Sequence, residues 1–150
     1  MKELTIAVVG ATGAVGQEIL KVMAERKIPY KELRLLASAR SAGTQIEYQG
    51  KIYTVQETTE NSFDDVDLAL FAGGPASRAF GRLAQSKGCV VIDNSSTFRL
   101  EPDVPLVVPE VNPEALKEHK GLIANPNCST ILLVSALYPL YKRSKVKRVI

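Results

Sequence analysis

The first sixteen residues constrain the fold of this chain more than any other stretch. Leu4-Thr5-Ile6-Ala7-Val8-Val9 is an apolar, β-branched run, as expected for a strand buried on both faces of a parallel sheet. It leads into Gly10-Ala11-Thr12-Gly13-Ala14-Val15-Gly16, where glycines let backbone N–H groups approach a pyrophosphate at a helix N-terminus. A simple tight turn is the alternative, but the position between a strand and a helix favours a nucleotide site.

An amphipathic helix is predicted after this glycine loop. Val15, Ile19, Val22 and Met23 are expected on its apolar side, and Gln17, Lys21 and Glu25 on its polar side. The residues predicted to bind the cofactor here are Gly10, Thr12, Gly13, Ala14, Val15 and Gly16.

The end of the next strand, residues 33–37, indicates which dinucleotide binds. An NAD site is expected to carry an acidic residue at this point, hydrogen-bonded to the ribose. Here the strand is followed by Ser38, Arg40 and Ser41, with no carboxylate. A guanidinium flanked by hydroxyls suits a phosphate monoester. A solvated loop has a similar composition, but its position predicts a site for the 2′-phosphate of NADP, with Ser38, Arg40 and Ser41 as contacts.

Further strands and helices complete an α/β pattern. Residues 45–56 alternate around Gly50 and predict a hairpin. A strand at 66–71 ends at Gly73-Gly74, which we expect either to approach the cofactor or to form a tight turn. A helix over 76–86, a strand over 89–93 and a short strand near 106–108 follow. The prediction is a doubly wound, mostly parallel α/β sheet of the Rossmann type with a hairpin addition.

Cys128 lies in Asn125-Pro126-Asn127-Cys128-Ser129-Thr130, directly before the apolar run Ile131-Leu132-Leu133-Val134. This pattern predicts a cysteine at the mouth of a buried helix. Helix N-termini favour a thiolate over a thiol, and a thiolate is a strong nucleophile towards acyl carbons. An arbitrary cysteine is more often a small buried residue. Beside a hydride carrier, however, a nucleophilic thiol indicates chemistry on an aldehyde or acyl group.

Arg99 closes the polar segment Asn94-Ser95-Ser96-Thr97-Phe98 after a predicted strand. A surface salt bridge is the ordinary role of such an arginine, but the carboxyl end of a parallel strand makes anion binding plausible. His119 is expected to be solvent-exposed near a helix C-terminus, with Gly121 as the C-cap. Cys89 opens an apolar strand and is expected in the core.

Composition argues against several other classes of protein. The net charge is only +3, and no patch interleaves basic with aromatic residues, so nucleic acid is not an indicated partner. Two cysteines form no disulfide framework, and no metal-ligand spacing surrounds the single histidine. The first apolar run is too short for a signal sequence or a membrane span. We therefore expect a cytoplasmic α/β domain without a metal.

Taken together, these motifs make the chain similar to the N-terminal part of the bacterial aspartate-semialdehyde dehydrogenase family. The resemblance covers essentially all 150 residues, and Asp93–Arg99, Pro109–Asn112 and Asn125–Thr130 are among the segments that carry it. It implies that Cys128 is the acyl-enzyme nucleophile and that Arg99 and Asn127 hold the substrate phosphate. It also implies NADP contacts by Thr12 to Val15 and by Arg40-Ser41.

The chemistry implied by the resemblance is reductive dephosphorylation of L-aspartyl 4-phosphate to L-aspartate 4-semialdehyde, with NADPH as the hydride donor. The product leads towards lysine, methionine and threonine. Members of the family also carry a second domain with an acid/base histidine and a substrate-binding arginine. We expect residues 1–144 to be the NADP-binding domain and residues 145–150 to begin that second domain. We therefore expect little or no turnover by these 150 residues alone. The resemblance also implies small-molecule partners and a homo-oligomer, a dimer or a tetramer, for the full-length enzyme.

Two other interpretations remain. The first is N-acetyl-glutamyl-phosphate reductase, which carries out the same type of reaction on a longer acyl phosphate. Its cysteine usually follows glycine and precedes Tyr-Pro, whereas Cys128 follows Asn127 and precedes Ser129-Thr130. A non-catalytic NADP-binding module with the same fold is the second, because a fold alone does not determine a function.

Overall fold

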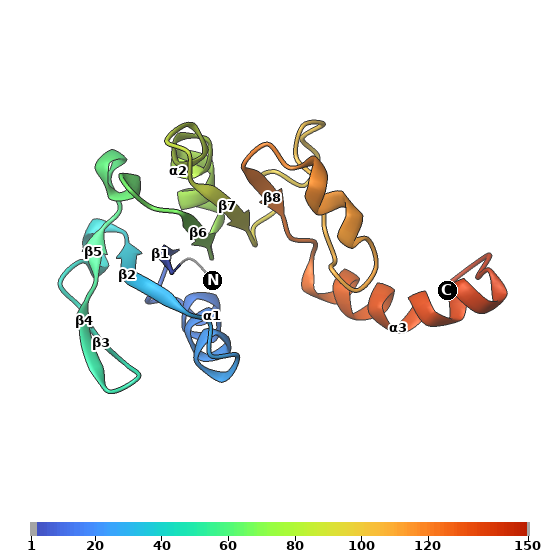
Figure 1. Cartoon of the computed structure of the whole chain (residues 1–150), viewed down its shortest axis with the longest axis horizontal. Coiled ribbons are helices and arrows are strands. Elements are labelled where there is room, and N and C mark those ends of the chain that lie inside the picture. Colours follow the sequence, from blue (N-terminus) through green and yellow to red (C-terminus); the bar gives the residue numbers. More distant parts are fainter. Residues whose placement is uncertain (1–2, 150) are drawn as a thin grey trace.

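The computed structural model describes residues 3–149, and its centre is a six-stranded parallel sheet (Figure 1). The strands are β1 (Leu4–Val9), β2 (Tyr30–Ala37), β5 (Gln56–Glu57), β6 (Leu68–Phe71), β7 (Val90–Asp93) and β8 (Leu122–Ala124). They are ordered β5-β2-β1-β6-β7-β8, and every neighbouring pair is parallel. The chain therefore winds outwards in both directions from β1, which confirms the predicted doubly wound α/β fold.

The predicted hairpin is also present. It consists of β3 (Gln45–Tyr48) and β4 (Lys51–Thr54), which pair antiparallel. Gly50 has a φ of +74° in the turn between them, a backbone conformation that glycine adopts without steric cost. The hairpin forms a two-stranded sheet of its own and is not hydrogen-bonded into the parallel sheet.

Helices lie on both sides of the sheet. The α-helices are α1 (Ala14–Glu25), α2 (Gly74–Ser86) and α3 (Cys128–Ser144), and the short 3₁₀ helices are η1 (Ala39–Ser41), η2 (Glu60–Phe63) and η3 (Pro113–Glu118). α1 contributes to the hydrophobic cluster on one face, and α2 packs against the cluster on the other. This arrangement encloses the sheet and leaves its carboxyl edge free to form a site.

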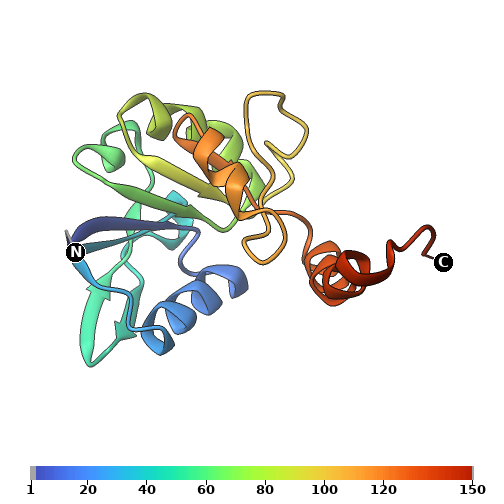
Figure 2. The ribbon, with the colours of Figure 1, turned by 45° about the vertical axis from the view of Figure 1, so that its right-hand side comes forward.

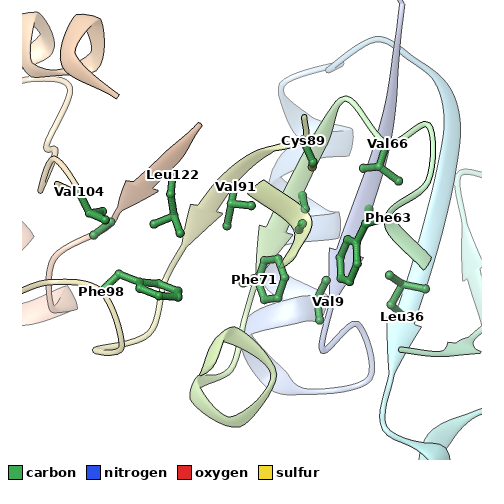
Figure 3. Close-up of a cluster of buried hydrophobic side chains, with 14 residues drawn as sticks. Val9, Leu36, Phe63, Val66, Phe71, Cys89, Val91, Phe98, Val104 and Leu122 are labelled. Atoms are coloured by element: carbon green, nitrogen blue, oxygen red, sulfur yellow. The ribbon is translucent and has the colours of Figure 1, made fainter. Parts of the chain in front are cut away.

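The alternating side chains of β1 divide the core between these two faces. Ile6 and Val8 belong to the cluster with α1, whereas Ala7 and Val9 belong to the cluster beneath α2. All four are fully buried. In the second cluster, the rings of Phe63 and Phe71 stack with their centroids 5.8 Å apart (Figure 3). Burial on both faces explains why β1 is an uninterrupted apolar run.

The predicted apolar side of α1 is wrong in part. Gly16, Leu20 and Met23 are the buried residues of this helix, whereas Val15 and Val22 are 49% and 42% exposed. The buried stripe follows positions i, i+4 and i+7, and it is set by Gly16, which must lie against the glycine loop. Val15 instead faces the pocket described below.

Three local predictions between β7 and β8 are also wrong. The expected strand near 106–108 is reduced to a single bridge between Leu106 and Ala124, because Pro105 and Pro109 supply no N–H groups for a ladder. Gly121 does not cap a helix: it has a φ of +99° and leads into β8. η3 ends instead at Glu118 with His119 as its C-cap. His119 is half-buried rather than exposed and accepts a hydrogen bond at Nδ1 from the Gly121 N–H.

α3 begins at Cys128 as predicted but is not a buried helix. None of its residues is buried, and it extends away from the sheet in both views (Figures 1 and 2). Leu132 is 74% exposed. Residues 145–149 after it have no regular secondary structure, and Ile150, the last residue of the strand expected there, lies outside the described residues. Within residues 3–149, no helix is both long enough and apolar enough to cross a membrane.

Candidate active site

A pocket of about 590 Å³ lies at the carboxyl ends of β1, β2 and β6, where the chain winds away from β1 in two directions. Open α/β sheets bind their ligands at this switch point. Ten of the residues predicted to bind the cofactor line the pocket, namely Gly10, Thr12, Gly13, Ala14, Val15, Gly16, Ser38, Arg40, Ser41 and Gly73. The volume is that of an ordinary small-molecule site.

The glycine loop leaves no room for side chains where it meets α1. Gly10 has a φ of +87°, and its N–H donates to the carbonyl of Leu36 at 2.8 Å. A Cβ on Gly16 would lie 2.2 Å from the carbonyl oxygen of Gly10. The N-cap of α1 is Gly13, which has no side chain to satisfy the first N–H groups of the helix. The residues that carry these groups line the pocket, and such a helix N-terminus suits an anionic group such as a pyrophosphate.

Arg40 gives the other end of the pocket its positive charge. It lies in η1, directly after β2, and its side chain is exposed. Within residues 3–149 it makes no ion pair. The hydroxyls of Ser38 and Ser41 line the same end. This combination of a guanidinium and two hydroxyls fits a phosphate monoester better than an uncharged ribose.

Several pocket residues were not found by sequence reasoning. Glu57 and Thr58 line the pocket beside Arg40, and Pro75 and Phe80 line it from α2. Thr58 is fixed by two hydrogen bonds to the carbonyl of Ala37, at 2.8 Å from N and 3.0 Å from Oγ1. β5 has only two residues and a polar sequence, so periodicity carries no signal for it.

Cys128 is the first residue of α3, directly after β8 and the Asn125–Asn127 loop, and its side chain is exposed. Asn127 is the N-cap: its Oδ1 accepts hydrogen bonds from the N–H groups of Ser129 at 3.0 Å and Thr130 at 3.4 Å. The capping interaction occupies the oxygen of Asn127, and within residues 3–149 its Nδ2 makes no hydrogen bond. The result is an accessible thiol beside amide donors at a helix N-terminus.

Arg99 fixes the loop that leads to Cys128. Its Nε donates to the carbonyl of Asn125 at 2.9 Å, and its Nη2 donates to the carbonyl of Asn94 at 3.1 Å. The side chains of these two asparagines are themselves joined, with Asn125 Nδ2 2.7 Å from Asn94 Oδ1. Arg99 Nη1 makes no hydrogen bond within residues 3–149. The half-buried guanidinium is thus held in place with donors remaining for an anion.

The structure therefore places the predicted residues in two groups at one edge of the sheet. Arg99, Asn127 and Cys128 follow β7 and β8 and do not line the pocket. Gly74 does not line it either: it is the first residue of α2 and faces the loop that contains Ser95 and Thr97. Within the part of the chain that the structure describes, no three His, Cys, Asp or Glu side chains gather as they would around a metal ion.

A doubly wound parallel sheet with a glycine loop against its switch-point pocket defines a dinucleotide-binding domain of the Rossmann type. The family comparison narrows this class. The family described as the NAD-binding domain of semialdehyde dehydrogenases matches residues 5–119, which is most of the chain. The chain belongs to this family.

Individual relatives agree with this family. Aspartate-semialdehyde dehydrogenase from Prochlorococcus marinus is 53% identical over 150 residues, which cover 99% of this chain and 44% of the relative. The crystal structure of aspartate semialdehyde dehydrogenase II from Vibrio cholerae, complexed with ASA, has a TM-score of 0.93 and 47% identity, covering 98% of this chain and 50% of that one. The Candida albicans enzyme with NADP has a TM-score of 0.74 and 26% identity, over 97% and 48% of the two chains. The chain spans less than half the length of the curated relative.

Proposed function

We propose that this chain is the NADP-binding, nucleophile-bearing part of an aspartate-semialdehyde dehydrogenase. One observation carries the proposal: the glycine-loop pocket with Arg40 and the exposed Cys128, which follows the loop held by Arg99, lie at the same edge of one parallel sheet. The relatives from Prochlorococcus marinus and Vibrio cholerae bear that enzyme's name.

The pocket fits the cofactor by its shape and charge. The backbone at Gly10, Gly13 and Gly16 brings the loop directly against the start of α1, where a Cβ at Gly16 would collide with Gly10, and this helix N-terminus suits the pyrophosphate. Arg40 and Ser41 would hold the 2′-phosphate, and the Gly73 turn would lie along the rest of the bound dinucleotide. NADPH bound there supplies the hydride that reduces an acyl group to an aldehyde. The Candida albicans relative, whose structure contains NADP, supports this choice of cofactor.

The second group of residues provides the acyl chemistry. In the proposed reaction the thiolate of Cys128 attacks the acyl carbon of L-aspartyl 4-phosphate, a C–S bond forms, and the C–O bond to phosphate breaks. Arg99 holds the departing phosphate together with Nδ2 of Asn127. Backbone N–H groups at the start of α3 stabilise the oxyanion that forms on the carbonyl oxygen. Reduction of the thioester then releases L-aspartate 4-semialdehyde and restores the thiolate.

The two alternatives have less support. N-acetyl-glutamyl-phosphate reductase does not fit the residues around the nucleophile, since Asn127 precedes Cys128 and Ser129-Thr130 follows it. A non-catalytic NADP-binding module has no use for a cysteine that is exposed at a helix N-terminus while the other cysteine of the chain is buried.

The proposal extends to the setting of the enzyme. Residues 1–144 act as the NADP-binding domain, and the residues from 145 onwards lead into a substrate and dimerisation domain that supplies the acid/base histidine. The partners are small molecules and further copies of the same protein. The enzyme acts in the cytoplasm, on the route towards lysine, methionine, threonine and diaminopimelate.

The direct test of the mechanism is Cys128→Ser in the protein at its full natural length. We expect turnover of aspartate semialdehyde with phosphate and NADP to fall by at least about 1,000-fold, because serine is a far weaker nucleophile at neutral pH. NADPH affinity should stay within about two-fold, since Cys128 does not line the pocket. Cys89→Ala is the matched control and should keep its turnover. Retained turnover in Cys128→Ser would discard the mechanism.

A further inference from the structure

Asp93 is a buried carboxylate that neither the pocket nor the nucleophile accounts for. It is the last residue of β7, and its side chain is 0% exposed. Carboxylates are rarely buried so completely unless they are paired or hydrogen-bonded. Within residues 3–149 Asp93 makes no ion pair. Its Oδ1 lies 2.5 Å from Ser77 Oγ and 3.1 Å from the N of Ser95, and its Oδ2 lies 2.7 Å from Ser95 Oγ.

One arm of this network reaches the wall of the cofactor pocket. Ser77 lies in the first turn of α2 and is also fully buried. Its hydroxyl is 2.9 Å from the carbonyl oxygen of Gly73, so a single proton serves both Asp93 and the Gly73 turn. Gly73 lines the pocket. The carboxylate of Asp93 is therefore one side chain away from the surface against which the cofactor would lie.

The other arm holds the loop that carries Arg99. The hydroxyl of Ser95 is 2.8 Å from Thr97 Oγ1, and the N–H of Thr97 donates back to Ser95 Oγ at 3.0 Å. These contacts fold residues 95–97 against Asp93. The Arg99 guanidinium, two residues further on, then reaches the carbonyl of Asn94 at 3.1 Å.

The backbone of Asp93 extends the connection to the nucleophile. Its carbonyl accepts a hydrogen bond from the N–H of Asn125 at 2.8 Å, and Asn125 opens the loop that leads to Cys128. Three segments that are distant in sequence thus meet at Asp93: the Gly73 turn, the Arg99 loop and the Cys128 loop. The contacts to Ser77 and Ser95 need the carboxylate and would be lost with an apolar residue at position 93, whereas the backbone contact to Asn125 would remain.

We propose that Asp93 is a positioning residue that sets the Gly73 turn and the Arg99 loop relative to each other, through Ser77 on one side and Ser95 on the other. This inference rests on the proposed function, because it assigns NADPH to the pocket and phosphate to Arg99. Its specific content is that the two arms are separable: Ser77 serves the cofactor and Ser95 serves the anion. The contact between the arms, from Thr97 Oγ1 to the carbonyl of Gly74, is long at 3.4 Å and couples them only weakly.

The experiment uses Ser77→Ala, Ser95→Ala and Asp93→Asn in the protein at its full natural length. NADPH affinity is measured by nicotinamide fluorescence, and the anion site by the protection that inorganic phosphate gives Cys128 against iodoacetamide. Ser77→Ala should weaken NADPH binding about ten-fold and leave phosphate protection unchanged, because it loses a hydrogen bond to a charged group on that side only. Ser95→Ala should do the reverse, and Asp93→Asn should impair both.

Val91→Ala is the control for a merely structural effect. It removes a fully buried side chain from the same strand without touching the network, so it should lower the free energy of unfolding and change neither binding readout. If the serine variants instead lose both readouts together, or neither, the positioning role is overturned even if Asp93→Asn fails to fold. If the wild-type protein itself shows no NADPH binding and no phosphate protection, the proposed function is overturned and this inference with it.

Discussion

At the scale of single residues, burial separates the two cysteines of the chain. Cys89 is 1% exposed in the core beneath α2 (Figure 3), whereas Cys128 is exposed at the start of α3. Burial, reinforced by the charge of Asp67, raises the pKa of the Cys89 thiol from 9.0 to about 12. A thiol in that position stays protonated and inert at neutral pH. Cys128 is consequently the cysteine that is free to react.

This contrast predicts both labelling and pH dependence. Iodoacetamide at pH 8 should modify Cys128 alone, as peptide mass spectrometry would show.

Because the pKa of Cys89 is higher in the folded state, its contribution to stability is complete below pH 9 and is lost as the pH rises towards 12. Relative to Cys89→Ala, the wild-type free energy of unfolding should therefore fall by about 1 kcal/mol between pH 8 and pH 10. Labelling of Cys89 in the folded chain, or no such fall, would contradict this account.

Gly16 is the second residue whose role can be tested alone. A Cβ there would lie 2.2 Å from the Gly10 carbonyl oxygen and 2.7 Å from Ala11 Cα, both of which are backbone atoms. We expect Gly16→Ala to lower the free energy of unfolding by about 2 kcal/mol, since the loop and α1 must separate. Gly13→Ala is the matched control: its Cβ would meet Gly10 O at 3.4 Å, and its cost should stay near 0.5 kcal/mol. Equal costs in urea unfolding would remove the steric argument.

At the scale of elements, α3 differs from the other two helices. α1 buries Leu20 and Met23, and α2 buries Ser77 and Ala84, but α3 buries none of its residues. It also contains Pro139, which removes one backbone hydrogen-bond donor from its interior. Its stability in these 150 residues therefore depends on local interactions such as the Asn127 cap.

Hydrogen exchange of the 150-residue chain tests this difference. Amides in α3 should exchange on the order of 100-fold faster than those in β1, because α3 opens without disturbing the core. α1 serves as the internal control, since it is shorter than α3 but has a buried face and should be protected. Protection of α3 equal to that of α1 would mean that contacts other than those in this structure stabilise it.

Elements differed in how far the sequence could predict them. β1 and the glycine loop were predictable because burial on both faces and a helix N-terminus each leave a local pattern. The same apolar signal misled at Ile131–Val134, since a run of apolar residues does not say what covers it. Val15 and Val22 were misplaced for a related reason: contact between Gly16 and the loop, rather than hydrophobicity, sets the rotation of α1.

At the scale of the whole molecule, the parallel sheet brings the two parts of the candidate site to one edge. The sequence identified Arg40, Arg99 and Cys128 as candidate site residues, and the topology puts the segments that carry them at the carboxyl ends of β2, β7 and β8. Sequence reasoning missed Glu57, Thr58 and the Asp93 network, because these depend on contacts between segments far apart in the chain. Local patterns carry no signal for such contacts.

The central claim, that the glycine-loop pocket binds NADP through Arg40, is tested most directly by titrating the chain with NADPH and NADH, with nicotinamide fluorescence as the readout. We expect a clear preference for NADPH. Arg40→Ala should weaken NADPH binding by about 10- to 100-fold and NADH binding far less, because only NADPH carries the 2′-phosphate. Arg26→Ala is the control. It also removes one positive charge, but at the C-terminal end of α1, away from the glycine loop, so it should change neither affinity. Equal losses for both cofactors in Arg40→Ala, or no binding by a chain that circular dichroism shows to be folded, would contradict the account.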